Sequence, residues 1–221
     1  MNTKDRATRI LLKLQKTFSL PKWTALSRKL FRTLIRTVLS QATADRNTNR
    51  AFRSLSEKFS ITPKALANAD MEEIKEAIRV AGLYTNKARV IKNLSHMLLE
   101  QFDGSLEFIY SLPLEEARSK LMSLPGVGPK TADVVLLFCA GRPVIPVDTH
   151  VKRVSGRLGL TPQRSNYEEI RGALQSLYQP QDYLPVHLLL ISLGRKYCKA
   201  RKPLCNQCPV NTLCPSSQIS D

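Results

Sequence analysis

Apolar residues recur along most of the chain with the three-to-four-residue spacing of amphipathic helices. Ile10, Leu11, Leu14 and Phe18 show this spacing near the N-terminus. The same spacing returns in later runs: Leu30, Leu34, Ile35, Val38 and Leu39; Val90, Ile91, Leu94 and Leu98; Val151, Val154 and Leu158; Ile170, Leu174 and Leu177; Leu184, Leu188 and Ile191. No run shows the convincing apolar–polar alternation of a half-buried strand. The pattern predicts an all-α protein built from many short helices.

Helix-start signals agree with this pattern. Thr62-Pro63 places a capping side chain before a first-turn proline, and Asp70-Met71-Glu72-Glu73 is typical of a capping box. Breaks are expected at Ser19-Leu20-Pro21, around Asp103-Gly104, and at Gly141-Arg142-Pro143. The last break separates a compact middle region from a more basic C-terminal third.

Composition and charge narrow the class of protein. Hydrophobic residues make up 43% of the 221 residues, which is enough for a packed core. The formal net charge of +16 and a pI near 9.9 favour a polyanionic partner, most commonly a nucleic acid. No apolar run is long enough to span a membrane, and the first residues lack the apolar segment of a signal peptide. We therefore expect no membrane association and an intracellular location, in the cytoplasm or at the nucleoid if the cell is prokaryotic.

Four of the five cysteines lie close together near the C-terminus. Cys198, Cys205, Cys208 and Cys214 have the spacing C-x6-C-x2-C-x5-C. Without an export signal, such a group indicates a metal site more than two disulfides, and spacing alone does not separate zinc from an iron–sulfur cluster. Cys139 lies in an apolar run, so we expect a buried thiol there.

The segment Leu124-Pro125-Gly126-Val127-Gly128 joins two helical patterns. Two glycines at this spacing allow a tight hairpin whose backbone can approach another chain closely. The backbone amides would converge near the N-terminus of the second helix, where they can hold a phosphate oxygen. An ordinary corner between two helices is the alternative.

This hairpin resembles the helix-hairpin-helix motif of the endonuclease III family of DNA glycosylases. The resemblance extends to Lys130, to Val147-Asp148-Thr149-His150, to the segments 39–45 and 82–88, and to the cysteine spacing, which in that family holds a 4Fe–4S cluster. These matches occur in the family's order from about residue 28 to residue 214. The resemblance implies two helical domains: residues 24–142, ending in the hairpin, and residues 1–23 combined with residues 143–221, carrying the cluster.

The resemblance also implies an activity. The expected enzyme is a bifunctional DNA glycosylase and AP lyase that removes oxidised pyrimidines from double-stranded DNA and cleaves the abasic site by β-elimination. Its expected partner is duplex DNA that contains damaged bases or abasic sites, bound by a monomer. The alternatives are a monofunctional G·T or G·U mismatch glycosylase of the same superfamily, which generally lacks the lysine, and a non-catalytic DNA-binding module.

Two residues are the expected catalytic pair. Lys130 would attack the sugar C1′ as a neutral amine. Its place in the first turn of a helix disfavours the ammonium, whereas nearby phosphates and a carboxylate favour it, so the sequence does not give the net shift. Asp148 would take a proton or stabilise positive charge on the sugar. A solvated lysine and a helix N-cap, respectively, are the ordinary alternatives.

The remaining expected site residues contact DNA or the cluster. Gln41 and Leu83 match family positions that fill the gap left by an extruded base, although Leu83 could be an ordinary core or surface residue. The other expected DNA contacts are Lys87, Gly126, Val127, Gly128, Lys199 and Arg201, and the expected cluster ligands are Cys198, Cys205, Cys208 and Cys214. Pro129 and Asp133 depart from the family pattern, which often has a basic residue and an asparagine at these positions.

Overall fold

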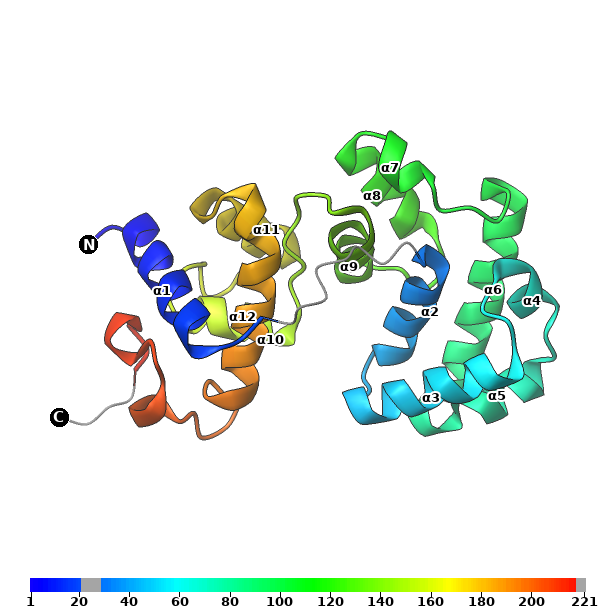
Figure 1. Ribbon diagram of the computed structural model, residues 1–221, viewed down its shortest axis with the longest axis horizontal. Helices are drawn as coiled ribbons and strands as arrows, with labels where there is room; N and C mark the ends of the chain where they lie inside the picture. Colours follow the sequence, from blue (N-terminus) through cyan, green and yellow to red (C-terminus); the bar gives the residue numbers. More distant parts are fainter. Residues whose placement is uncertain (21–28, 218–221) are drawn as a thin grey trace. The chain divides into compact units, whose positions relative to one another are not determined.

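The computed structural model describes residues 1–20 and 29–217, and across these ranges the regular structure is helical (Figure 1). The chain forms two compact units, Leu26–Arg142 and the combination of Met1–Ala25 with Pro143–Asp221. The boundary expected at residues 23 and 24 lies outside the described residues. Within the described ranges, no helix combines the length and the apolar content that a membrane span requires.

The middle unit contains the helix-hairpin-helix segment. Its helices are α2 (Leu30–Ser40), α3 (Asp45–Lys58), α4 (Pro63–Asn68), α5 (Met71–Ile78), the 3-10 turn η1 (Arg79–Ala81), α6 (Tyr84–Phe102), α7 (Phe108–Ser111), α8 (Leu114–Ser123) and α9 (Pro129–Ala140). The long helix α6 packs against α4 and α5, and α2 packs against α9 (Figure 1). Fully buried aliphatic side chains fill the space between these helices: Leu34, Ile35, Leu39, Leu55, Leu66, Ile74, Ile78, Ile91, Leu94 and Leu98.

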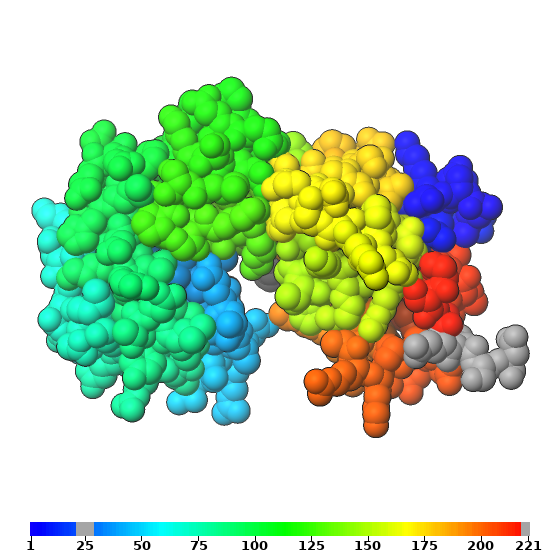
Figure 2. Space-filling view, turned by 180° about the vertical axis from the view of Figure 1, so that it is seen from behind, coloured from blue at the N-terminus to red at the C-terminus, as the bar shows by residue number. Residues whose placement is uncertain are grey.

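The second unit is assembled from both ends of the chain. Its elements are α1 (Thr3–Thr17), α10 (Thr149–Arg157), α11 (Tyr167–Leu177), η2 (Pro180–Asp182), α12 (Tyr183–Lys196), η3 (Cys205–Gln207) and η4 (Asn211–Leu213). Figures 1 and 2 both show α1, in blue, beside the red C-terminal segment, and Lys13 Nζ donates to Thr212 Oγ1 at 3.4 Å. The buried side of α1, with Ile10 and Leu14, belongs to the same core as Val210. The N-terminal helix therefore supports the segment that carries the cysteines.

The predicted helix caps form at Thr62 and Asp70, although among the described residues the capping box at Asp70 has only its forward half, without the reciprocal bond from the Glu73 side chain. The Thr62 hydroxyl accepts the Ala65 amide at 3.2 Å, and Asp70 Oδ1 accepts the Glu72 and Glu73 amides at 2.8 and 3.0 Å. A complete capping box, which the sequence analysis did not identify, begins α11: Asn166 and Glu169 bond reciprocally through side chain and backbone.

Candidate functional site

The hairpin between α8 and α9 depends on one glycine for its shape. Gly126 has φ +74°, in the left-handed region, and a Cβ built on it would lie 2.3 Å from Val90 Cγ1. The Val127 amide closes the turn on the Leu124 carbonyl at 3.1 Å, and the Val127 side chain is buried. Gly126 is therefore required by the fold, and Val127 anchors the hairpin to its own unit.

Gly128 has a different role in the same hairpin. Its φ of −91° suits any residue, and a Cβ added to it would meet no atom within 4 Å. The residue is exposed and caps α9, whose first-turn amides have no partner within the helix. Folding therefore does not require a glycine at position 128. The missing side chain instead leaves the backbone open to close approach by another molecule.

Lys130 lies in the first turn of α9, directly after the hairpin. Pro129 occupies the first helical position, where a missing amide costs nothing, and Lys130 is half-buried behind it. Farther along the same turn, Asp133 is completely buried and accepts the Arg118 Nε proton at 2.7 Å. Asp133 thus joins the two helices of the motif and gives this departure from the family pattern a structural function.

Asp148 begins α10 in the second unit. Its Oδ1 accepts the Val151 amide at 2.7 Å, which confirms the predicted N-cap, and its side chain is half-buried. Nearby, His150 Nδ1 lies 3.1 Å from Arg153 Nη2, which makes it a polar neighbour of α10. The capping bond fixes the orientation of the Asp148 carboxylate.

Gln41 and Leu83 lie on two exposed turns of the middle unit. Gln41 ends α2 and donates from Nε2 to the Gly126 carbonyl at 2.9 Å, so its turn contacts the hairpin. Leu83 is 66% exposed and has φ +47°, a strained backbone for a residue with a branched side chain. An exposed apolar side chain on strained backbone is the kind of feature that concentrates at functional sites. The alternative of a core leucine at position 83 is wrong.

Lys87 does not lie on the surface, where a DNA contact would require it. Only 3% of the residue is exposed, and Nζ donates to the Leu39 carbonyl at 2.9 Å, the Ala81 carbonyl at 2.9 Å and Thr43 Oγ1 at 2.5 Å. Burial lowers the pKa of this lysine. Its three donors already have acceptors, so a direct phosphate contact does not fit this geometry.

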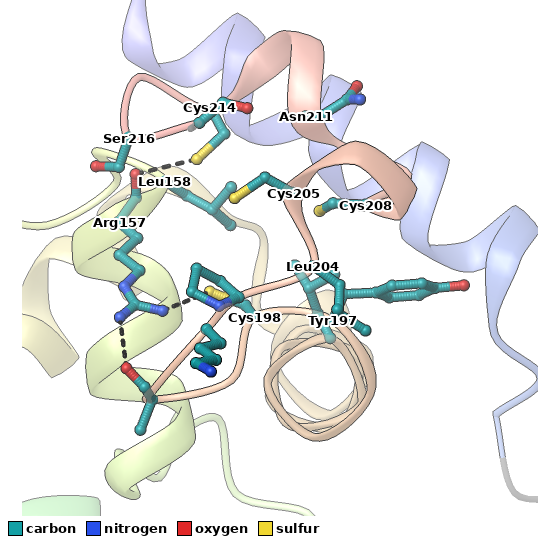
Figure 3. Close-up of a pocket in the computed structure, with 15 residues that line it drawn as sticks. Arg157, Leu158, Tyr197, Cys198, Leu204, Cys205, Cys208, Asn211, Cys214 and Ser216 are labelled. Carbon is teal, nitrogen blue, oxygen red and sulfur yellow. Dashed lines mark hydrogen bonds between the residues drawn. The ribbon is translucent and has the colours of Figure 1, made fainter. Parts of the chain in front are cut away.

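The four C-terminal cysteines line one cavity of about 520 Å³ (Figure 3). The 3-10 turns η3 and η4 place three of them, and the Cys198 amide bonds to the Leu193 carbonyl at the end of α12. All four are free thiols, and Figure 3 shows the sulfur atoms of Cys205, Cys208 and Cys214 turned toward the same space. Burial raises the pKa values of the Cys208 and Cys214 thiols.

The donor set suits a cluster better than a single ion. No three His, Cys, Asp or Glu side chains of residues 1–20 and 29–217 are placed to hold one metal ion, whereas the four thiols surround a larger space. Thiolates are the usual ligands of iron–sulfur clusters. Cys139, which is buried in α9 of the other unit, takes no part in this cavity, as predicted.

Arg157 of α10 holds the loop between the first two cysteines. Its guanidinium donates to the Lys199 carbonyl at 2.7 Å. It also donates to the Ala200 carbonyl at 3.1 Å and lies 3.5 Å from Cys198 Sγ (Figure 3). The Cys214 thiol donates in turn to the Arg157 carbonyl at 3.3 Å. Lys199 and Arg201 are exposed on this loop, which occupies the orange edge of its unit in Figure 2. One arginine therefore fixes the backbone that presents two cations.

Known proteins resemble this chain over most of its length. The model of HhH-GPD superfamily base excision DNA repair proteins matches residues 35–180, and the iron–sulfur binding domain of endonuclease III matches residues 198–214. Endonuclease III of Sulfolobus acidocaldarius is 39% identical over 189 residues, covering 85% of this chain and 82% of the relative. The chain belongs to the endonuclease III family. Endonuclease III of Escherichia coli, 36% identical over 86% of each chain, agrees with this assignment.

Solved structures of the endonuclease III family agree as well. A trapped covalent intermediate of endonuclease III with DNA is 36% identical to this chain, with a TM-score of 0.86 and 98% coverage of both chains. A thermostable thymine-DNA glycosylase has a TM-score of 0.78 over 97% of this chain and 96% of its own, but its 21% identity shows the fold alone.

Membership of the endonuclease III family confirms several predictions. The fold is all-α, with a helix-hairpin-helix and a C-terminal iron–sulfur domain, and the cofactor is a 4Fe–4S cluster. The enzyme is a bifunctional DNA glycosylase and AP lyase of base excision repair. The sequence pattern does not reveal the supporting residues Arg118, Arg157 and Thr43, because their main partners are backbone carbonyls or lie on other helices.

Proposed function

We propose that this enzyme excises oxidised pyrimidines from duplex DNA and cleaves the strand 3′ to the resulting abasic sugar, with Lys130 and Asp148 as the catalytic pair. The observation that carries the proposal is the placement of Lys130 in the first turn of α9, directly after a hairpin whose backbone is open at Gly128. This placement puts an amine next to the amides best suited to hold a DNA phosphate.

Lys130 acts as the nucleophile. Its neutral amine forms a bond to C1′ while the bond from C1′ to the damaged base breaks, and the base departs with the electron pair and gains a proton. Opening of the sugar ring then gives a Schiff base. Loss of a C2′ proton breaks the bond from C3′ to the 3′ phosphate oxygen, and hydrolysis releases Lys130.

Asp148 stabilises the positive charge that develops on the sugar as the base leaves. Its capping bond to the Val151 amide uses one oxygen and fixes the direction of the carboxylate. The capping role and the electrostatic role therefore belong to the same side chain.

The proposed DNA contacts are of two kinds: contacts to the phosphates of the DNA backbone, and side chains that fill the gap left by the extruded base. The hairpin of Gly126, Val127 and Gly128 binds phosphate through backbone amides other than that of Val127, which closes the turn on Leu124, and the exposed cations Lys199 and Arg201 extend this contact along the duplex. Gln41 and Leu83 occupy the gap left by the extruded base.

Cys198, Cys205, Cys208 and Cys214 hold the 4Fe–4S cluster in this proposal, because their thiols line one cavity. The bound cluster supplies a covalent framework for the basic loop, and the excision reaction requires no electron from it. In this proposal the enzyme acts as a monomer on DNA inside the cell.

Borohydride trapping tests the proposal. Reduction of the Schiff base leaves the parent protein covalently attached to a duplex that carries an oxidised pyrimidine, and Lys130→Gln abolishes this product while keeping damaged-duplex binding. Lys120→Gln, the same change at a partly exposed lysine of α8, is the matched control and traps normally. Undiminished trapping by Lys130→Gln would identify another amine as the nucleophile. Complete base excision without strand cleavage by the parent would favour a monofunctional mismatch glycosylase.

A further inference from the structure

Lys87 is a buried cation that the chemistry of excision does not use. It lies in the first turns of α6, four residues after Leu83, and within the described part of the chain it forms no ion pair. A buried ammonium with only neutral acceptors is costly to desolvate. Such a group is better explained by what it holds in place than by a gain in stability.

The three acceptors of Lys87 come from two separate segments. Leu39 and Thr43 lie on either side of Gln41, whereas Ala81 belongs to the turn that leads to Leu83. The Lys87 ammonium has three protons and the structure gives it three acceptors, so every donor is used. One side chain therefore joins the turn of residues 39–43 to the turn of residues 81–83.

Thr43 strengthens the same connection. Its hydroxyl lies 2.6 Å from the Ala81 carbonyl and 3.0 Å from the Gln41 carbonyl, and its single proton goes to one of them at a time. Because Lys87 donates to the Thr43 oxygen, that proton remains available to a carbonyl. The shorter distance favours Ala81, which adds a second bond between the two turns.

Both turns contain strained backbone that needs such support. Ala42 has φ +51° and Leu83 has φ +47°, and neither is a glycine. Conformations of this kind cost about 1–3 kcal/mol each and persist only where surrounding bonds determine them. The Lys87 bonds end at Leu39, Thr43 and Ala81, within two or three residues of the strained positions.

We propose that Lys87 is a positioning residue that holds the turns carrying Gln41 and Leu83 in a fixed arrangement relative to each other. This role replaces the direct DNA contact expected for Lys87 from the sequence. The inference rests on the proposed gap-filling role of those two side chains. In that role both side chains fill the gap left by the extruded base, so their relative placement sets how well the vacated position is filled.

Hydrogen exchange of the DNA-free protein tests this fixed arrangement directly. In Lys87→Met, which keeps the aliphatic stem but removes the donors, amides of residues 39–43 and 81–84 exchange at least 10-fold faster. Lys92→Met is the matched control, because Lys92 is on the same helix and donates to the Ala69 carbonyl, outside both turns. Thr43→Val, at a half-buried position, provides the same test if Lys87→Met does not fold, with a smaller increase expected.

Kinetics test the functional consequence. Single-turnover excision of an oxidised pyrimidine falls about 10- to 100-fold in Lys87→Met, whereas cleavage of a preformed abasic site, which has no base to extrude, falls less than 3-fold. In a Gln41→Ala/Leu83→Ala background, Lys87→Met causes little further loss, because the side chains it positions are gone.

Unchanged exchange in both turns would overturn the fixed arrangement. Equal loss of excision and abasic-site cleavage, or a full additional loss in the doubly substituted background, would overturn the positioning role. Failure of the proposed function gives a different result, since the parent would then not excise the base while the exchange difference persisted.

Discussion

The two glycines of the hairpin are expected to respond in opposite ways to the same substitution. Gly126→Ala places a Cβ on backbone with φ +74° and 2.3 Å from Val90 Cγ1. The left-handed conformation costs an alanine about 1–2 kcal/mol. Displacing Val90, whose β-branched side chain has few alternative rotamers in a helix, costs about 1–3 kcal/mol more.

The expected loss for Gly126→Ala is therefore about 2–5 kcal/mol in the free energy of unfolding. In a protein of this size it corresponds to a fall in Tm on the order of 10 °C. Adding Val90→Ala removes the overlapping methyl groups, so the cost of Gly126→Ala in that background falls to the backbone part, about 1–2 kcal/mol. Urea denaturation of the four proteins in this cycle measures both parts.

Gly128→Ala is expected to lower the affinity for duplex DNA without lowering the stability of the fold. Its φ of −91° and the open space around the Cβ position leave the free energy of unfolding unchanged or raise it by about 0.4–1 kcal/mol. The added methyl group stands between the backbone amides and an approaching phosphate, so duplex affinity falls about 10-fold or more in a fluorescence anisotropy titration. Wild-type stability of Gly126→Ala would refute the steric argument, and wild-type affinity of Gly128→Ala would refute the phosphate-binding role of the hairpin.

Three further predictions concern the other site residues. Asp148→Asn keeps the capping acceptor but removes the negative charge, so excision is expected to slow by about 10² or more in single-turnover kinetics. The affinity for damaged duplex, measured by titration, should change little. Equal losses in rate and affinity would contradict the electrostatic role. Cys139→Ala leaves the iron content and visible absorption intact, whereas Cys205→Ser loses the cluster, and stoichiometric zinc in anaerobically purified parent protein would overturn the assignment. If the protein contacts about five to eight phosphates, the logarithm of the duplex association constant falls with log salt at a slope near −4.5 to −7. The double substitution Lys199→Ala/Arg201→Ala flattens that slope without altering lesion preference. A slope flatter than about −2 for the parent protein would exclude an extensive phosphate footprint.

The sequence predicts those features that depend on local chemistry. The helical class, the caps at Thr62, Asp70 and Asp148 and the burial of Cys139 all follow from spacing and side-chain type, and the structure agrees with each. The cluster and the family follow from motifs that are contiguous or nearly so. These are short-range patterns, which a sequence displays directly.

Lys87 shows why other features could not be predicted. The resemblance to the family predicts a DNA contact for this lysine, and here its acceptors include the Leu39 carbonyl, 48 residues away in the chain. Every residue has a backbone carbonyl, so the sequence cannot show which carbonyls accept the bonds of a given side chain. The Arg118–Asp133 pair was hidden for a related reason, because only the packing of α8 on α9 shows that the two charges face each other.

The assembly of the second unit from both ends of the chain has a consequence for biosynthesis. The middle unit, Leu26–Arg142, is continuous and can fold on the ribosome as soon as it has emerged, because domains fold as units during translation. Helix α1 is made first but must wait for α12 and the cysteine segment before its apolar side is covered, a delay on the order of 10 s at ordinary translation rates. Iron–sulfur loading thus has to follow synthesis of residue 214, and a nascent chain stalled after residue 142 carries a folded hairpin without a cluster. A circular permutant that joins the original ends and opens near residue 26 removes this wait by making both units contiguous.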